Sequence, residues 1–134
     1  MAVIDASVWI AFLKGEGNDV FFEQAKQIIQ SVSSNQERVR IPAIAFTEVA
    51  GVIKRITKDN DAAWESVLFM KDLEPEVFIN FGELEPIATE IAIKHGSIKG
   101  ADACYLAVAQ VTRSNLYTFD QQQQDVFDAM SKTW

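Results

Sequence analysis

Short apolar runs alternate along the chain with longer segments in which apolar residues recur at helical spacing. The short runs, which predict β-strands, cover residues 1–4, 38–41, 77–79 and 116–119. The helical segments cover residues 18–33, 43–56, 61–73, 84–95, 101–111 and 121–130. Because strands alternate with helices, the pattern predicts a three-layer α/β/α domain with a parallel sheet of four or five strands.

No repeat and no linker-like composition interrupts this pattern, so residues 1–134 are expected to form a single domain. Individual positions add local detail. We expect a loop at residues 5–7, Pro42 in the first turn of a helix, a C-cap at Gly96, a solvated helix face at residues 121–124, and Trp64 in the core.

The composition is that of a globular protein from a reducing compartment. Of the 134 residues, 49% are hydrophobic and 23% are charged, so the chain can bury a core and is not a disordered tail. One cysteine excludes a disulfide framework and a cysteine-based zinc site, and it fits the cytoplasm. The apolar start of the chain is interrupted by Asp5, is too short to span a bilayer and lacks a basic flank. Neither a signal peptide nor membrane association is expected.

Acidic residues outnumber basic ones by 19 to 12, which gives a formal net charge of -7. This number alone would not suggest a polyanionic partner. The imbalance indicates either that the partner is not a nucleic acid or that some of the acids hold a metal ion.

Four carboxylates stand in apolar sequence where core residues would be expected. Asp5 follows the first predicted strand and Asp120 the fourth, so both should lie at the carboxyl edge of the sheet, where open α/β sheets bind ligands. Glu48 and Asp102 lie within apolar helices, where an ionised carboxylate is costly unless it is paired or binds a metal. The alternative is structural: Asp5 and Asp120 would be helix N-caps or turn residues, and Asp102 a favourable anion at a helix N-terminus.

Convergence of these four carboxylates at one edge would favour a divalent cation. They come from separate elements, which is unlike a calcium-binding loop. Carboxylates that meet in a cleft repel each other, and a hard divalent cation removes the repulsion. Because an all-oxygen donor set selects Mg²⁺ or Mn²⁺ over Zn²⁺, the sequence predicts a site for one of these two metals.

Four segments of the chain resemble, in this order, the motifs of the PIN-domain ribonucleases, and within them the VapC-type toxins of toxin–antitoxin pairs. They are Val3-Ile-Asp-Ala-Ser7, Phe46-Thr-Glu-Val49, Ala101-Asp-Ala-Cys-Tyr-Leu-Ala107 and Leu116-Tyr-Thr-Phe-Asp120. Each segment alone is a weak signal, whereas four of them in the family's order over one domain form a fairly specific one.

The resemblance implies a metal-dependent endoribonuclease that hydrolyses RNA phosphodiester bonds with Mg²⁺ or Mn²⁺. For the toxins of the family it also implies a homodimer and a small VapB-type antitoxin that occludes the acidic pocket, often with a basic side chain. We expect the helices between residues 18 and 56, with Trp9 and Phe12, to supply the surface for that partner. The resemblance assigns Asp5, Glu48, Asp102 and Asp120 to the catalytic metal-binding cluster, with Ser7 and Thr118 as supporting hydroxyls.

The chain departs from the family pattern towards its C-terminal end. Family members often carry a further acid shortly after the fourth carboxylate, and here Asp125 follows only after four glutamines. The family usually ends in a fifth strand, which is short or missing here. The basic residue that often precedes the fourth acid is replaced by Tyr117-Thr-Phe.

An RNA substrate also requires basic residues near the site, because phosphate contacts dominate nucleic-acid affinity. Two other residue types that often carry chemistry have structural interpretations here: His95 as a cap or surface residue, and Cys104 as a small core residue. The candidates for the basic rim are Lys14, Lys54, Arg55, Lys58 and Lys99.

Three other functions fit parts of the pattern. A phosphoacceptor receiver-like domain also gathers acids at a sheet edge, but it needs an aspartate at the end of a central strand and a lysine after the last one. Here Asn80-Phe81-Gly82 follows the third strand, and no lysine closely follows Asp120. A PIN nuclease of RNA processing or decay, without an antitoxin, would carry the same four acids. A catalytically silent PIN-like binding module would share the fold but cleave nothing.

Overall fold

A computed structural model describes residues 1–34, 37–79 and 82–134. Within these residues, four short strands form one sheet: β1 (Ala2–Ile4), β2 (Val39–Pro42), β3 (Glu76–Phe78) and β4 (Asn115–Tyr117). The helices are α1 (Ala6–Leu13), α2 (Phe22–Ser33), α3 (Ile44–Thr57), α4 (Asn60–Asp72), α5 (Leu84–Lys94), α6 (Gly100–Thr112) and α7 (Gln121–Ser131).

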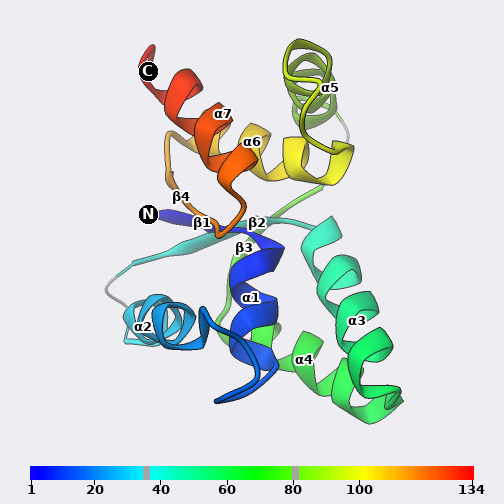
Figure 1. Ribbon diagram of the computed structural model, residues 1–134. Helices are drawn as coiled ribbons and strands as arrows, with labels where there is room; N and C mark the ends of the chain where they lie inside the picture. The colour runs from blue at the N-terminus through cyan, green and yellow to red at the C-terminus, as the bar shows by residue number, and fades with distance from the viewer. Residues whose placement is uncertain (35–36, 80–81) are drawn as a thin grey trace.

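The sheet has the order β3-β2-β1-β4, and every pair of neighbours is parallel. Figure 1 shows α5, α6 and α7 on one side of the sheet and α1, α2 and α4 on the other, with α3 running away from the sheet beside α1. The contacts agree, since α6 packs on β1, β2 and β4, while α1 packs against α2 and α3. The predicted three-layer α/β/α fold with a parallel sheet is therefore confirmed, with four strands in the described part of the chain.

Helix α1 was not expected, because residues 5–7 were interpreted as a loop. The helix begins at Ala6, directly after β1, because the Asp5 carboxylate accepts a hydrogen bond from the Ser7 backbone N–H (3.1 Å) and so caps the first turn. Ala6, Val8, Trp9 and Ala11 are all buried. A helix that is apolar on nearly every side lacks the amphipathic period by which a sequence reveals a helix.

Several local expectations were wrong. Helix α2 begins four residues later than predicted, at Phe22, and Val20 is 91% exposed. Pro42 closes strand β2 instead of opening a helix. The C-cap of α5 is His95 and not Gly96, which does not adopt the left-handed conformation that favours glycine. Trp64, which was expected in the core, is 68% exposed. Of the residues that were predicted to follow the third strand, Asn80 and Phe81 lie outside the described part of the chain.

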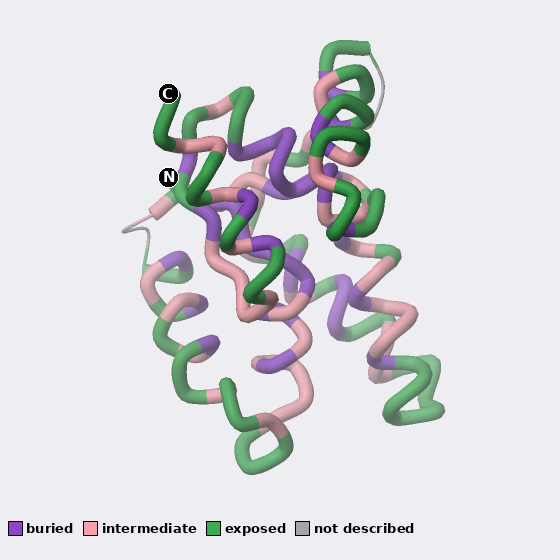
Figure 2. Tube along the Cα trace, turned by 45° about the horizontal axis from the view of Figure 1, so that its top comes forward, coloured by how far each residue is buried: buried purple, intermediate pink, exposed green. Residues whose placement is uncertain are grey.

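The core lies where α6 crosses the sheet. Residues 103–109 of α6 are buried in an unbroken run, and all three residues of β1 are fully buried. In Figure 2 these buried segments meet at the centre of the molecule, while the outer faces of the surrounding helices are exposed. No helix among the described residues has the length and apolar character needed to cross a membrane.

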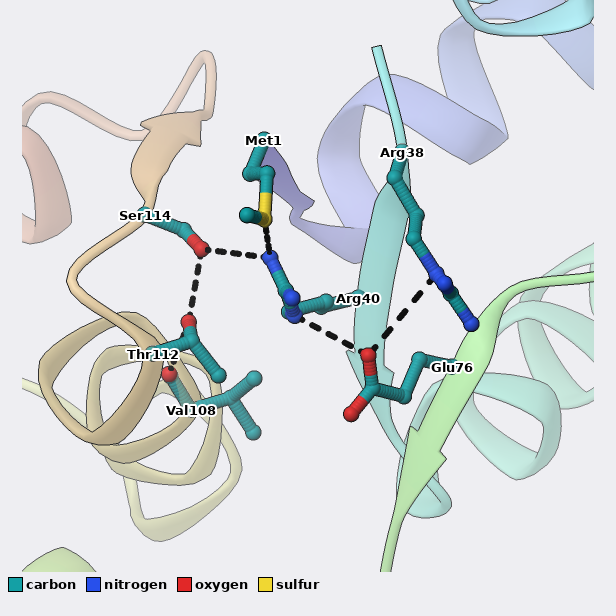
Figure 3. A network of polar contacts seen from close by, with 7 residues as sticks. All are labelled: Met1, Arg38, Arg40, Glu76, Val108, Thr112 and Ser114. Atoms are coloured by element: carbon teal, nitrogen blue, oxygen red, sulfur yellow. Dashed lines mark hydrogen bonds and ion pairs between the residues drawn. The ribbon is translucent and has the colours of Figure 1, made fainter. Parts of the chain in front are cut away.

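A polar network ties the strands together at their amino ends (Figure 3). Arg40 of β2 donates from Nε to the Glu76 carboxylate of β3 (3.1 Å) and from Nη1 to Ser114 Oγ, which precedes β4 (3.5 Å). Ser114 Oγ in turn lies 2.6 Å from Thr112 Oγ1 at the end of α6. The structural ion pairs of the sheet thus lie at one end, and the candidate carboxylates follow its other end.

Candidate functional site

The order of the strands singles out the edge of the sheet beside β1. From β1 the chain goes to β2 and β3 on one side and returns to β4 on the other. Open α/β sheets bind ligands at such a reversal, outside the carboxyl ends of the strands. Asp5 directly follows β1, and its backbone N–H donates to the Tyr117 carbonyl at the end of β4 (3.0 Å). Asp5 therefore lies at the reversal point itself.

The other three candidate carboxylates reach this edge from separate elements. Asp120 lies shortly after β4 and is the N-cap of α7. Glu48 lies in the second turn of α3, the helix that follows β2, and Asp102 lies in the first turn of α6. Helix α3 starts at the carboxyl end of β2. Helix α6 leads into the amino end of the parallel strand β4, so its own N-terminus lies at the carboxyl edge of the sheet.

Two hydroxyl groups hold the first carboxylate in place. Thr118 Oγ1 donates to Asp5 Oδ2 (3.1 Å), and Ser7 Oγ lies 3.4 Å from Thr118 Oγ1. Ser7 Oγ also accepts from the Phe119 backbone N–H (3.0 Å), which joins α1 to the segment after β4. That Ser7 and Thr118 support the carboxylates in the function of the site stays a prediction.

The structural interpretation of Asp5 and Asp120 as N-caps is also correct. The Asp120 carboxylate accepts from the Gln123 backbone N–H (3.2 Å), just as Asp5 accepts from Ser7. A cap uses only some of the lone pairs of a carboxylate, which offers about four acceptor positions. Capping fixes the position of each side chain and leaves acceptor capacity for a ligand.

The charges of the four carboxylates act on one another. Burial raises the pKa of Glu48 above its ordinary value of 4.5, and the nearby charges of Asp5 and Asp102 raise it further. Burial likewise raises the pKa of Asp102 above 3.8, with further contributions from Asp5 and Asp120. Glu48 is therefore within range of the charges of Asp5 and Asp102, and Asp102 is within range of those of Asp5 and Asp120. Their role in catalysis and metal binding remains a prediction.

We expect the metal-free protein to lose stability as the pH rises above 3.8 and 4.5, the ordinary pKa values of Asp102 and Glu48. The pKa values of Glu48 and Asp102 are raised in the folded state. At pH values above the ordinary pKa of each group, 4.5 for Glu48 and 3.8 for Asp102, the folded state therefore binds more protons than the unfolded state. Their contribution is fully present below these values and is lost as the pH rises through the folded-state pKa values. The pKa of Asp19 is lowered in the folded state, so its contribution to stability is lost as the pH falls below 3.8, outside the range of this prediction. Thermal unfolding in EDTA measures the effect, and Glu48→Gln should reduce the slope. An equal slope in this variant would contradict the assignment to Glu48.

Gln123 belongs to the site although the sequence interpretation placed it on a solvated face. Its side chain is fully buried beside Asp5 and Thr118. With its amide nitrogen turned towards Asp5, it lies 3.2 Å from both carboxylate oxygens and 2.8 Å from Thr118 Oγ1. We favour this orientation because the opposite one faces the amide oxygen towards a carboxylate. The only sequence signal was its place three residues after the N-cap Asp120.

The donor set fits a hard divalent cation, although the side chains do not yet surround one. In the described residues, no three Asp, Glu, His or Cys side chains are arranged to hold a metal ion. The prediction that the four carboxylates are close enough to share metal ions is therefore not met in this conformation. Glu48 Oε1, however, is buried without a hydrogen-bond partner. An unpaired carboxylate oxygen among three other carboxylates is the type of ligand that Mg²⁺ and Mn²⁺ prefer.

Only some of the predicted basic residues remain candidates for RNA binding. Lys99 precedes Asp102, and its charge lowers the pKa of that carboxylate, so it lies beside the site. Lys14 pairs with Asp19 at 3.1 Å. Lys54, Arg55 and Lys58 are exposed at the far end of α3. His95 is a helix cap and Cys104 is buried, as the sequence predicted.

A surface cavity of about 610 Å³ lies elsewhere, between α5, the C-terminal end of α6 and α7. Its lining includes Lys94, Arg113 and Trp134 and none of the four carboxylates. Asp102 lies at the opposite end of α6. Strand topology and charge, and not a deep cavity, define the candidate site.

Family comparison agrees with the fold and the order of the motifs. Residues 2–128 match the PIN domain family. The chain therefore belongs to this family, as the four sequence segments predicted. A comparison with curated protein sequences finds no match.

Solved structures with a similar fold include one toxin. The chain is similar to VapC20 of Mycobacterium tuberculosis, described as a toxin that cleaves the sarcin–ricin loop, with a TM-score of 0.77 and 22% identity over 93% of this chain and 94% of that one. The chain is also similar to PAE2754 of Pyrobaculum aerophilum, with a TM-score of 0.67 and 15% identity over 98% of this chain and 87% of that one. For FitAcB of Neisseria gonorrhoeae the TM-score is 0.65 and the identity 18%, over 96% of this chain and 94% of that one. At such identities the likeness concerns the fold.

Proposed function

We propose that this protein is a metal-dependent endoribonuclease and the toxin of a VapBC-type toxin–antitoxin pair. The observation that carries the nuclease proposal is the placement of Asp5, Glu48, Asp102 and Asp120, which come from separate elements, at the carboxyl edge of a PIN-family sheet. Burial and the neighbouring carboxylates raise the pKa values of Glu48 and Asp102, so their ionised forms cost stability unless a cation neutralises them. A site of this kind is retained for chemistry rather than for stability.

In this proposal the four carboxylates hold Mg²⁺ or Mn²⁺. A bound divalent cation supplies Lewis acidity, which activates water for attack on phosphorus and neutralises charge on the phosphate. Thr118 and Gln123 fix the orientation of Asp5 by donating hydrogen bonds to its carboxylate. The Lys99 ammonium adds positive charge at the rim, where an RNA phosphate approaches.

The toxin part of the proposal is supported by fold and surface. VapC20, a toxin, shares the fold over nearly the whole of both chains. Trp64 and Leu68 lie one turn apart on α4 and are 68% and 56% exposed, so they form an apolar surface of the kind that a protein partner covers. We propose this surface for an antitoxin or a second copy of the chain. Trp9, which was expected to contribute, is fully buried and does not.

Cleavage of RNA by the purified protein tests the proposal. We expect Mn²⁺ or Mg²⁺ to support cleavage of a structured RNA and EDTA to abolish it. Asp102→Asn should slow cleavage by more than about a hundredfold, since losing even an outer-shell partner of a metal typically costs 10–100-fold. Asp128→Asn removes an exposed charge on α7 and is the matched control. Cleavage that survives EDTA, or equal rates in both variants, would contradict the metal-nuclease function. Binding without cleavage would favour a silent module.

A further inference from the structure

Two buried polar atoms in the described part of the chain have no hydrogen-bond partner, and both belong to residues at the candidate site. They are Glu48 Oε1 on α3 and Tyr105 Oη on α6. Tyr105 is fully buried. A buried polar group without a partner is destabilising, so natural proteins rarely keep one without a reason.

The two atoms are complementary neighbours. Burial is the largest cause of the raised pKa of the Tyr105 hydroxyl, and the charge of Glu48 is the next largest; hydrogen bonding from Tyr105 in turn lowers the pKa of Glu48. The groups therefore approach one another, although their geometry falls short of a regular hydrogen bond. A phenol can donate one proton, and an ionised carboxylate can only accept. One hydrogen bond between them would satisfy both atoms.

Tyr105 also has the right place on its helix. It lies three residues after Asp102, and residues three apart lie on the same face of a helix. Its hydroxyl is influenced by the charges of Glu48, Asp5 and Asp102, which places it against the carboxylate cluster from the core side. A hydroxyl in this position can contact the cluster without being exposed to substrate.

We propose that Tyr105 is the positioning residue of Glu48: its phenolic O–H donates to one carboxylate oxygen and leaves the other free for a divalent cation. This inference rests on the proposed function. Hydrogen bonds from such outer-shell groups orient metal ligands and strengthen binding. Tyr117, whose hydroxyl donates to Glu37 (2.8 Å), provides a matched control, because Tyr117→Phe deletes the same atom elsewhere.

The competing interpretation is that Tyr105 only fills the core. In that case phenylalanine would serve equally well or better, because its ring packs in the same space without a polar atom to bury. The two interpretations predict opposite signs for the change in stability when the hydroxyl oxygen is deleted, and a double-mutant cycle with Glu48 measures whether that change depends on Glu48.

The first experiment measures urea unfolding midpoints in EDTA for the wild type, Tyr105→Phe, Glu48→Ala and the double variant. Tyr105→Phe should lower the midpoint in the wild-type background, because it removes the donor from Glu48. With Glu48→Ala present it should leave the midpoint unchanged or raise it, because the hydroxyl has lost its acceptor. Tyr117→Phe should be additive with Glu48→Ala. Additive effects of Tyr105→Phe and Glu48→Ala would overturn the proposal.

The second experiment measures Mn²⁺ affinity from the electron paramagnetic resonance of free Mn²⁺. Tyr105→Phe should weaken binding by 10–100-fold, and Tyr117→Phe should leave it unchanged. Unchanged affinity in Tyr105→Phe would overturn the positioning role while the proposed metal site stands. Absence of Mn²⁺ binding by the wild type would overturn both, and absence of RNA cleavage alone would affect only the nuclease proposal.

Discussion

Millimolar Mn²⁺ is expected to raise the melting temperature of the wild-type protein by about 10 °C. A ligand that binds only the folded state at a hundredfold excess over its dissociation constant stabilises that state by about 2.7 kcal/mol. In a domain of 134 residues, each kcal/mol corresponds to roughly 4 °C. The source of the gain is the repulsion among the candidate carboxylates, which raises the pKa of both Glu48 and Asp102.

Asp102→Asn should lose most of this gain. The variant keeps a side chain that can accept from the Lys99 backbone N–H (3.4 Å), so the start of α6 is preserved. In EDTA it should melt higher than the wild type, because one repelling charge is gone. Asp128→Asn, at an exposed position on α7, should respond to Mn²⁺ like the wild type. If all three proteins shift by the same amount, the carboxylates are caps and surface charges and the proposed function loses its physical basis.

Trp9→Ala is expected to be the most destabilising single substitution considered, at about 3–5 kcal/mol. Trp9 is fully buried in α1, and its indole Nε1 donates to the Ile4 carbonyl (3.2 Å), the last residue of β1 before Asp5. Alanine would leave a cavity and an unpaired carbonyl beside the site. Equilibrium unfolding in urea, with EDTA present throughout, measures the loss without any contribution from metal.

Trp64→Ala serves as the matched control for this substitution. Trp64 is 68% exposed on α4, so its removal should change the free energy of unfolding by no more than about 0.5 kcal/mol. A loss at Trp64 comparable to that at Trp9 would show that the apolar surface of α4 is part of the core rather than a surface for a partner.

The strands and most helices could be predicted because their signals are local. Strand β1 is a short apolar run, and α3 and α4 carry apolar residues at helical spacing with polar residues between them. Prediction failed where a helix is buried on nearly all sides and where an apolar residue is exposed. Helix α1 is apolar almost all round, so periodicity does not reveal it, whereas Val20 is apolar and exposed. The local pattern indicates whether a residue favours burial, but it does not show which other elements pack over that residue.

The candidate carboxylates could be predicted because an acid in apolar sequence is conspicuous. Asp5 and Asp120 follow strands, and a parallel sheet places those positions at one edge. Gln123 and Tyr105 were missed for the opposite reason. A glutamine in a polar run resembles a solvated face, and a tyrosine in an apolar helix resembles core. Gln123 proves to lie beside Asp5, and Tyr105 is a core residue for which a role at Glu48 is proposed.

The sequence by itself determined the strand–helix alternation, the parallel sheet and the four acids, since these depend on side-chain period and on the cost of burying charge. Only the tertiary structure decided how the acids are held. The contacts of Asp5 with Thr118 and Gln123 join residues more than a hundred positions apart, and the approach of Tyr105 to Glu48 joins two helices. Such contacts depend on how α1, α3, α6 and α7 meet at the carboxyl edge of the sheet, a geometry set by packing of the whole core and not recorded in any local pattern.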